Sequence, residues 1–189
     1  EDGIRDHCVT GVQTCALPIL KVTTAELAKR SEITEAAIYK HFPSKRKIFE
    51  ELVVFFEESV FTRIKVMKEE SKPEDFPGQL IALVLKFCET NKGFSRILTR
   101  EVFTADEVKI IDKVANCFEK INIEIRQSLQ EYERTTKKKL NLNLAASCDL
   151  LLSCLEGQIQ SFVRSKFKKD LSGSWEDQWR FLKKAIFAN

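Results

Sequence analysis

The sequence predicts an all-α protein, and two observations support this prediction. Apolar side chains recur every three to four residues through most of the chain, which is the spacing of one helix face. The alternation of polar and apolar residues that indicates a half-buried β-strand occurs nowhere in the sequence. With 189 residues, 43% of them apolar, the chain is long enough for one or two helical domains with their own cores.

The first predicted elements are two short helices joined by a three-residue turn. Thr24 precedes the helical segment AELAKRS, and Thr34 precedes a second segment, EAAIYKHF. Pro43 ends the second helix, because proline disfavours a helical conformation in the residue before it. Ser44 can then cap a third, long helix that starts at Lys45 and runs towards residue 70.

Further helices are predicted after a break that is bounded by Ser71 and Gly78. Ser172, Gly173 and Ser174 break the chain again and cap the last helix. These helices cover roughly residues 78–90, 93–102, 105–135, 142–168 and a final segment that is marked by Trp175 and Ile186.

Composition excludes several classes of function. The six cysteines form no C-x-x-C pair, so free thiols are expected rather than a metal or redox site. No run of about 18 uncharged apolar residues is present, so no membrane span is expected. The sequence also lacks nucleotide-binding glycine motifs, a G-x-S-x-G nucleophile and paired metal ligands. We therefore expect neither catalysis nor a cofactor.

Residues 1–19, EDGIRDHCVTGVQTCALPI, show no periodicity and differ in composition from the rest of the chain. A secretory signal would need a basic start and an apolar run, and this segment has neither. Its back-translation resembles the two fixed halves of a common short-read sequencing adapter, with His7 and Cys8 encoded by an index between them. We therefore interpret the segment as non-native. Adapter codons found at this position in the source genome would refute that interpretation.

The local charge and geometry of residues 20–47 indicate DNA binding. Two short helices joined by a tight turn can place the second helix in the major groove. The segment holds seven Lys or Arg against three Glu, an excess larger than the net charge of +3 of the whole chain. In such modules phosphate contacts hold the protein in register, and base-edge contacts select the site. A solvated corner of a helical bundle would show the same pattern, so these features alone leave both interpretations open.

The segment TTAELAKRSEITEAAIYKHFPSK resembles the helix-turn-helix signature of the TetR family, in which a Tyr-x-His-Phe run closes the recognition helix. The resemblance implies that Glu35, Ala36 and Lys40 face base edges. Glu32 departs from the family, which often has glycine in the turn, and a left-handed conformation there would cost about 1 kcal/mol. The DNA-binding residues expected from the resemblance are Thr24, Thr34, Glu35, Ala36, Tyr39, Lys40, His41 and Lys45.

The resemblance also implies a division of the chain. Residues 20–46, with the motif at 23–42, would form the DNA-binding domain, and residues 47–189 a helical domain for dimerisation and partner binding. In the TetR family a first helix packs across the two reading helices, and residues 1–19 stand in its place. We therefore expect this chain to bind DNA poorly, and a chain with its native start to bind well.

Three later segments resemble a more specific family of TetR-fold proteins, the bacterial nucleoid occlusion factors. These segments are FFEESVFTRI, NKGFSRILT and CLEGQIQSFVRSKFKK, and the similarity runs from about Lys21 to Trp179. The resemblance implies a cytoplasmic, nucleoid-associated homodimer that binds palindromic sites in double-stranded DNA. It also implies that the DNA-bound protein antagonises assembly of the tubulin-like division protein FtsZ.

The same resemblance implies a site for the FtsZ tail on the long helix after the reading head and on the helix that follows it. An exposed aromatic residue beside an arginine can anchor a peptide, because both residue types are enriched at binding hot spots. In an alternative interpretation, the apolar members of this set are ordinary core residues and the arginine is a solvated charge. The residues implied for the partner site are Phe55, Arg63, Leu83 and Lys86.

The last two predicted helices are expected to form the dimer interface. They present a broad apolar surface, and Gly157 permits a close approach. Two such pairs make a four-helix interface, whose twofold symmetry suits a palindromic site. The expected interface residues are Leu151, Leu152, Leu155, Ile159, Trp175 and Trp179.

Two other functions fit the same sequence. A ligand-responsive TetR-family repressor would use the fold to change the spacing of its two reading heads. A DNA-bound scaffold with a partner other than FtsZ is the third interpretation. Few polar residues converge among the apolar helix stripes, so a small-molecule effector is not expected.

Overall fold

The computed structural model describes residues 34, 36, 40, 42–103 and 107–188. This part of the chain is helical, without a β-strand, which confirms the predicted all-α class. Residues 1–19 and most of the predicted helix-turn-helix lie outside the described residues. The helices are α4 (Lys45–Glu70), α5 (Phe76–Thr90), α6 (Lys92–Leu98), α7 (Val108–Thr136), α8 (Leu144–Arg164) and α9 (Ser172–Ile186).

Helix α4 begins where the sequence predicts, because Ser44 caps it. The Ser44 side chain accepts a hydrogen bond of 3.2 Å from the backbone N–H of Lys47, which also donates to the Ser44 carbonyl at 3.0 Å. Apolar side chains three or four residues apart then form one buried stripe along the helix. This stripe consists of Phe49, Val53, Phe56, Val60 and Ile64.

Helix α5 lies at the centre of the fold and packs against each of the other described helices. Pro77 stands in its first turn, where a missing backbone N–H costs no hydrogen bond. Gly78 allows α9 to approach closely: a Cβ atom at this position would lie 2.1 Å from Cε2 of Trp179. The indole N–H of Trp175 donates a hydrogen bond of 2.9 Å to the Gly78 carbonyl. These contacts fasten the last helix to the middle of the core.

Three predicted helix boundaries are corrected by the structure, the first being that of α8, which ends at Arg164 rather than near residue 168. Helix α6 ends at Leu98 rather than near residue 102, and Arg100 just beyond it is left-handed with φ 62°. The Ser172-Gly173-Ser174 segment does not break the chain but forms the first turn of α9. The Asp170 carboxylate accepts a hydrogen bond of 2.8 Å from the backbone N–H of Gly173, so a residue before the segment caps the helix.

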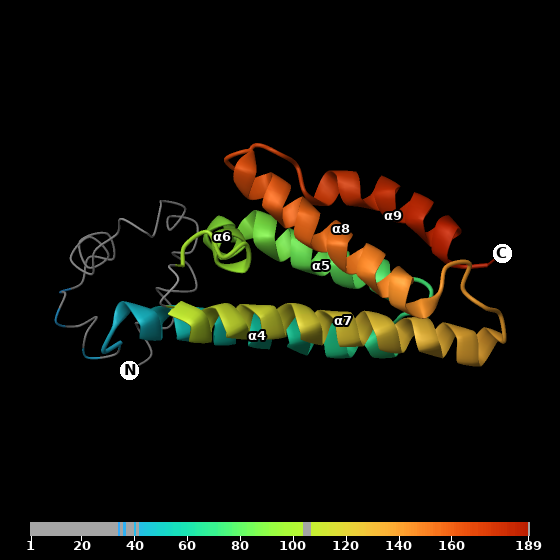
Figure 1. The fold of residues 1–189 in the computed structure, drawn as a ribbon, viewed down its shortest axis with the longest axis horizontal. Helices are drawn as coiled ribbons and strands as arrows, with labels where there is room; N and C mark the ends of the chain where they lie inside the picture. Colours follow the sequence, from blue (N-terminus) through green and yellow to red (C-terminus); the bar gives the residue numbers. More distant parts are fainter. Residues whose placement is uncertain (1–33, 35, 37–39, 41, 104–106, 189) are drawn as a thin grey trace.

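The molecule is elongated, with α4 and α7 side by side along its length (Figure 1). The start of α4, helix α6 and the turn between α8 and α9 lie at one end, and the connection from α7 to α8 lies at the other. At that second end, Leu140 forms a β-bridge with Phe187, and the Tyr132 hydroxyl donates to the carbonyl of Ala188 (3.0 Å). Each described helix is too short or too polar to cross a membrane.

Candidate DNA-binding and partner-binding surfaces

Two of the predicted DNA-contacting residues share one exposed helix face. Ala36 and Lys40 are both helical and exposed, and their spacing of four residues places them one turn apart on the same side. Thr34 is also exposed and lies just before them. The other residues predicted for this helix-turn-helix fall outside the described residues, so their roles stay predictions. They are Thr24, Glu35, Tyr39 and His41.

The start of α4 adds three consecutive basic residues to this end of the molecule. Arg46 and Lys47 form ion pairs one turn along the helix, with Glu50 at 3.3 Å and Glu51 at 2.8 Å. The hydrogen bond from Lys47 to Glu51 and the attraction between their charges raise the pKa of Lys47. Lys45 stands at the first position of α4, where free backbone N–H groups favour a bound phosphate. Its ammonium lies 5.7 Å from the centre of the Phe49 ring.

The predicted partner residues divide into packed and exposed ones. Phe55 is half-buried, and its ring lies 6.5 Å from that of Phe87 and 5.9 Å from that of Phe94. Leu83 is also half-buried against the core. Lys86 is exposed and forms an ion pair of 2.9 Å with Glu89 of its own helix. Phe55 therefore supports the join between α4, α5 and α6, as the alternative interpretation of the sequence expected.

Arg63 lies on a groove that sequence reasoning only partly outlined. This groove, of about 550 Å³, runs between the second half of α4 and the start of α5. Val66 on its wall is 54% exposed and so presents an apolar side chain to the groove. Val66 and Met67 follow Arg63 by one helical turn, and that spacing is the signal that could have found them. The lining residues are Thr62, Arg63, Val66, Met67, Glu70, Ser71 and Gln79.

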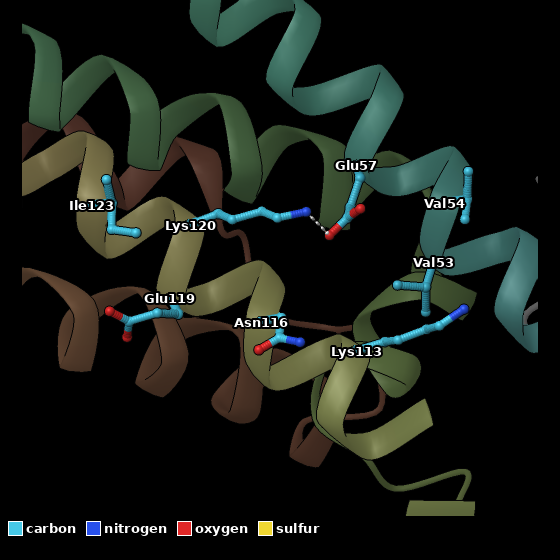
Figure 2. Close-up of a pocket in the computed structure, with 8 residues that line it drawn as sticks. All are labelled: Val53, Val54, Glu57, Lys113, Asn116, Glu119, Lys120 and Ile123. Carbon is cyan, nitrogen blue, oxygen red and sulfur yellow. Dashed lines mark hydrogen bonds and ion pairs between the residues drawn. The ribbon is translucent and has the colours of Figure 1, made fainter. Parts of the chain in front are cut away.

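A second groove of about 330 Å³ lies between α4 and α7 (Figure 2). Lys120 reaches across it from α7 and forms an ion pair of 2.7 Å with Glu57 of α4. The thiol of Cys117 donates to the same carboxylate at 3.4 Å. Burial, and then the charge of Glu57, raise the pKa of Cys117 to about 12, so this thiol stays protonated at neutral pH.

Most of the residues predicted for the dimer interface are buried within their own chain. Four of the six predicted side chains are at most 2% exposed, because they face the core of their own chain rather than a second copy. Trp179 is half-buried and covers Gly78. Leu152 is half-buried against the core as well. The four fully internal residues are Leu151, Leu155, Ile159 and Trp175.

Helices α8 and α9 expose a different face. Leu150 on α8 is 37% exposed, and Phe181 on α9 is 74% exposed, the largest value among the exposed apolar side chains of the described chain. Gly157 also lies on α8, and no neighbouring atom comes within 4 Å of the position where its Cβ would be. This outer face combines a protruding aromatic ring with a glycine gap. The two features suit contact with another helix pair.

Comparison with known proteins identifies both parts of the chain. Residues 18–52 match the family described as bacterial regulatory proteins, tetR family. Residues 78–186 match the family described as tetracyclin repressor-like, C-terminal domain, of the SlmA-like type.

The structure resembles the Bacillus subtilis regulator FadR in complex with stearoyl-CoA, with a TM-score of 0.74, 14% identity and coverage of 97% of this chain and all of that one. It also resembles PfmR from Thermus thermophilus, with a TM-score of 0.67, 14% identity and coverage of 94% and 96%. The fold is therefore that of TetR-family regulators.

Sequence similarity identifies a narrower group. The chain is 38% identical over 166 residues to the nucleoid occlusion factor SlmA of Shewanella baltica OS155, covering 87% of this chain and 84% of that protein. The factor of the same name from Marinomonas sp. MWYL1 is 35% identical over 173 residues, with coverage of 91% and 88%. The one from Shewanella halifaxensis is 37% identical over 185 residues, with coverage of 96% and 94%, so this alignment includes part of residues 1–19. The chain belongs to the family of SlmA nucleoid occlusion factors.

Proposed function

We propose that this protein binds palindromic chromosomal DNA as a homodimer and, when bound, inhibits assembly of FtsZ at the nucleoid. The observation that carries the proposal is the similarity to SlmA proteins over 84–94% of their length, which spans both the reading head and the helical domain. The relatives reported above are named as regulators or occlusion factors, and none is named as an enzyme.

The proposed DNA contacts come from the exposed face of Ala36 and Lys40 together with the start of α4. A short alanine side chain allows the backbone to approach a base pair, and a lysine one turn away can reach a base edge or a phosphate. Lys45 would hold a phosphate at the N-terminus of α4, where the backbone N–H groups and the helix dipole favour an anion. Thr24, Glu35, Tyr39 and His41 stay in the proposed DNA-binding set.

The proposed FtsZ site is the groove between α4 and α5. Its exposed Val66 and its Met67 offer an apolar floor, and Arg63 offers a positive charge to a carboxylate. An extended peptide with apolar and acidic side chains fits this chemistry. Lys86 and Leu83 would extend the contact along α5. We assign Phe55 a supporting role, since its ring packs among Phe87 and Phe94.

The proposed dimer forms through the outer faces of α8 and α9. Phe181 of one copy would insert near Gly157 of the other, because the glycine leaves room for a large ring. The resulting twofold symmetry matches a palindromic DNA site.

One experiment tests the proposed function directly. Protein purified from the full-length gene with its native start and a DNA duplex carrying a palindromic site of a SlmA relative are added to polymerising FtsZ, and assembly is followed by light scattering. We expect inhibition that needs the DNA. Arg63→Glu should abolish the inhibition, whereas Lys65→Glu, an equal change of charge at an exposed position outside the groove on the same helix, should retain it. FtsZ assembly that is unaffected by the DNA-bound parent protein would refute the proposal.

The alternative, a ligand-responsive repressor, has one observation behind it: the FadR neighbour was solved with stearoyl-CoA. In the described part of this chain, however, phenylalanine rings fill the space where α4, α5 and α6 meet. Their centres lie 5.2–6.5 Å apart, which leaves no room for an acyl chain between them. Saturating stearoyl-CoA should therefore not raise the melting temperature, and a rise of several degrees would favour the repressor. The rings belong to Phe55, Phe56, Phe87 and Phe94.

A further inference from the structure

The turn that follows α8 carries a concentration of positive charge that the proposed sites do not use. Residues 164–169, RSKFKK, hold four basic side chains and no acidic one, and we call this segment the basic turn. Arg164, Lys166 and Lys168 are exposed, and none of them has a carboxylate of the described chain within ion-pair distance. Lys169 instead folds back on α8 and donates a hydrogen bond of 2.8 Å to Gln158. Three positive charges of the basic turn are therefore exposed to solvent without an acidic partner in the described chain.

The backbone of the basic turn is held in an unusual shape. Lys166 and Phe167 are consecutive left-handed residues, with φ of 55° and 63°, although neither is glycine. Their N–H groups donate to the carbonyls of Val163 (2.9 Å) and Phe162 (3.0 Å), which closes the end of α8. The Ser165 hydroxyl accepts from the N–H groups of the two lysines at the end of the turn, at 3.2 and 3.1 Å. Left-handed non-glycine residues are costly and persist where surrounding contacts hold them, and the contacts named above hold these two at the end of α8.

The ring of Phe167 fixes the turn to the rest of the molecule. It packs edge-on against Phe162, with ring centres 5.1 Å apart, and the guanidinium of Arg96 lies 5.2 Å from the centre of the Phe167 ring. Because this ring faces inward, the charged side chains are what the turn presents outward. A protein interface would be expected to offer an exposed aromatic or aliphatic anchor among the charges.

Helix α6 extends the positive surface, and the carboxylates nearby are already engaged. Glu89 accepts hydrogen bonds from the hydroxyl of Ser172 and the backbone of Leu171, and Glu101 lies 3.5 Å from Arg96. Asp170 caps the first turn of α9. The three carboxylates are thus engaged by groups other than the exposed side chains of the basic turn, Glu89 also by an ion pair with Lys86. Helix α6 and its end add the basic residues Lys92, Arg96 and Arg100.

The basic turn lies at the same end of the molecule as the start of α4 (Figure 1). In a dimer formed through the outer faces of α8 and α9, with its twofold axis along the length of the molecule, both basic turns would lie at the same end as the two starts of α4. Two unpaired positive surfaces would then repel each other unless a polyanion lay across them.

We propose that the basic turn binds the phosphate backbone of duplex DNA, independently of base sequence and in addition to the helix-turn-helix. The inference rests on the proposed DNA-binding function. The duplex carries one charge per about 1.7 Å, so a row of exposed lysine and arginine side chains can neutralise several phosphates and release their counterions. An acidic protein segment would bind the same charges, and the experiment below separates the two.

The test compares two triple variants that each remove three positive charges. The first is Arg164→Gln, Lys166→Gln and Lys168→Gln. The matched control is Lys137→Gln, Lys138→Gln and Lys139→Gln, a set of exposed lysines just after α7, at the opposite end of the molecule (Figure 1). Binding of a random-sequence duplex is measured by fluorescence anisotropy between about 50 and 200 mM salt, where counterion release dominates. Circular dichroism melts verify that both variants fold like the parent.

We expect the first variant to reduce the slope of log K against log salt by up to about 2.7 per chain, at about 0.9 per lost phosphate contact. Over a fourfold salt range this removes a salt sensitivity of up to about 40-fold. The control should keep the parent slope within about 0.5. An equal slope for the parent and the first variant would overturn the inference, even if DNA-bound protein still inhibits FtsZ. Loss of binding to labelled poly-glutamate with an unchanged DNA slope would also overturn it and assign the surface to an acidic partner.

Discussion

Gly78 is the position at which one added methyl group should have the largest effect on this fold. In Gly78→Ala the new Cβ would lie 2.1–2.3 Å from three atoms of the Trp179 indole, far inside van der Waals contact. Overpacking of this kind costs about 1–3 kcal/mol. Displacing Trp179 also strains the hydrogen bond from Trp175 to the Gly78 carbonyl, worth about 1 kcal/mol, while alanine gains up to about 1 kcal/mol in helix propensity. The free energy of unfolding should therefore fall by about 2 kcal/mol.

That loss corresponds to a melting temperature about 4–8 °C lower for a chain of this size, measured by circular dichroism. Gly157→Ala is the matched control, made in the Phe181→Glu background so that no partner ring occupies the gap, because within the chain no atom lies within 4 Å of the new methyl group. It should melt at or above the temperature of the Phe181→Glu protein. In the background Trp179→Ala, the effect of Gly78→Ala should shrink, since the clashing ring is gone. A Gly78→Ala protein that melts with the parent would refute the assigned contact between α5 and α9.

Further predictions concern the dimer, acid stability and the phenylalanine cluster. Phe181→Glu should give folded monomers by light scattering, and a folded Phe181→Glu dimer would contradict the proposed interface on the outer faces of α8 and α9. Leu155→Glu should instead unfold the chain, because it buries a charge in the core. The hydrogen bond from Ser172 is the main cause that lowers the pKa of the Glu89 carboxylate to about 2. The ionised carboxylate therefore stabilises the fold above the ordinary pKa of about 4.5, and this contribution is lost as the pH falls towards 2. Urea unfolding should therefore show Glu89→Gln less stable than the parent at neutral pH, with a difference that shrinks below about pH 4; a constant difference would exclude this role. Phe55→Ala should lower the free energy of unfolding, measured by urea unfolding, by about 2 kcal/mol, because the half-buried Phe55 ring packs on two other rings. An unchanged stability would favour a role for Phe55 in the partner site.

Helix positions follow well from the sequence where only one face of a helix is apolar. In the segment of α8 the apolar residues at helical spacing, from Cys148 through Leu151 and Leu155 to Phe162, are the buried stripe of the structure. Its helix caps are also local signals: Asn143 accepts a hydrogen bond from Ala146, as an N-cap should. Such features depend on neighbours within a few residues, so sequence alone is enough to find them.

Register is harder to predict where both faces are apolar. The sequence IFEELVVFF at the start of α4 has apolar residues on several sides, so its periodicity fits a stripe through Ile48, Leu52 and Phe55 as well as one that starts a residue later. In the structure Phe49, Val53 and Phe56 are the buried ones, and they continue into Val60 and Ile64. The choice is made by α5 and α7, which pack against α4 from parts of the chain distant in sequence. Periodicity contains no information on those neighbours.

The burial of the candidate dimer residues also depends on contacts that are distant in sequence. An apolar stripe shows that a face is covered, but not whether the covering side chains belong to the same chain or to a second copy. Leu151 and Leu155 are covered by the chain itself. The close contact between Gly78 and Trp179 joins residues that are far apart in sequence, and no local pattern predicts it. The exposure of Phe181 depends on how α9 packs in the complete fold, so the sequence alone does not show it.

Helix α4 is one uninterrupted rod of 26 residues, about 39 Å long, and it belongs to both proposed activities. Lys45 opens it at the DNA end, and Arg63 stands on the partner groove near its other end. Because the helix is continuous, a change in its orientation at one end also changes its orientation at the other end. If DNA selects one orientation of α4, the groove is presented in that orientation only, and a peptide bound there must in turn favour the DNA-bound state by the same factor. The division protein and the chromosome would then each act as an effector of the other's binding, through the inclination of a single helix.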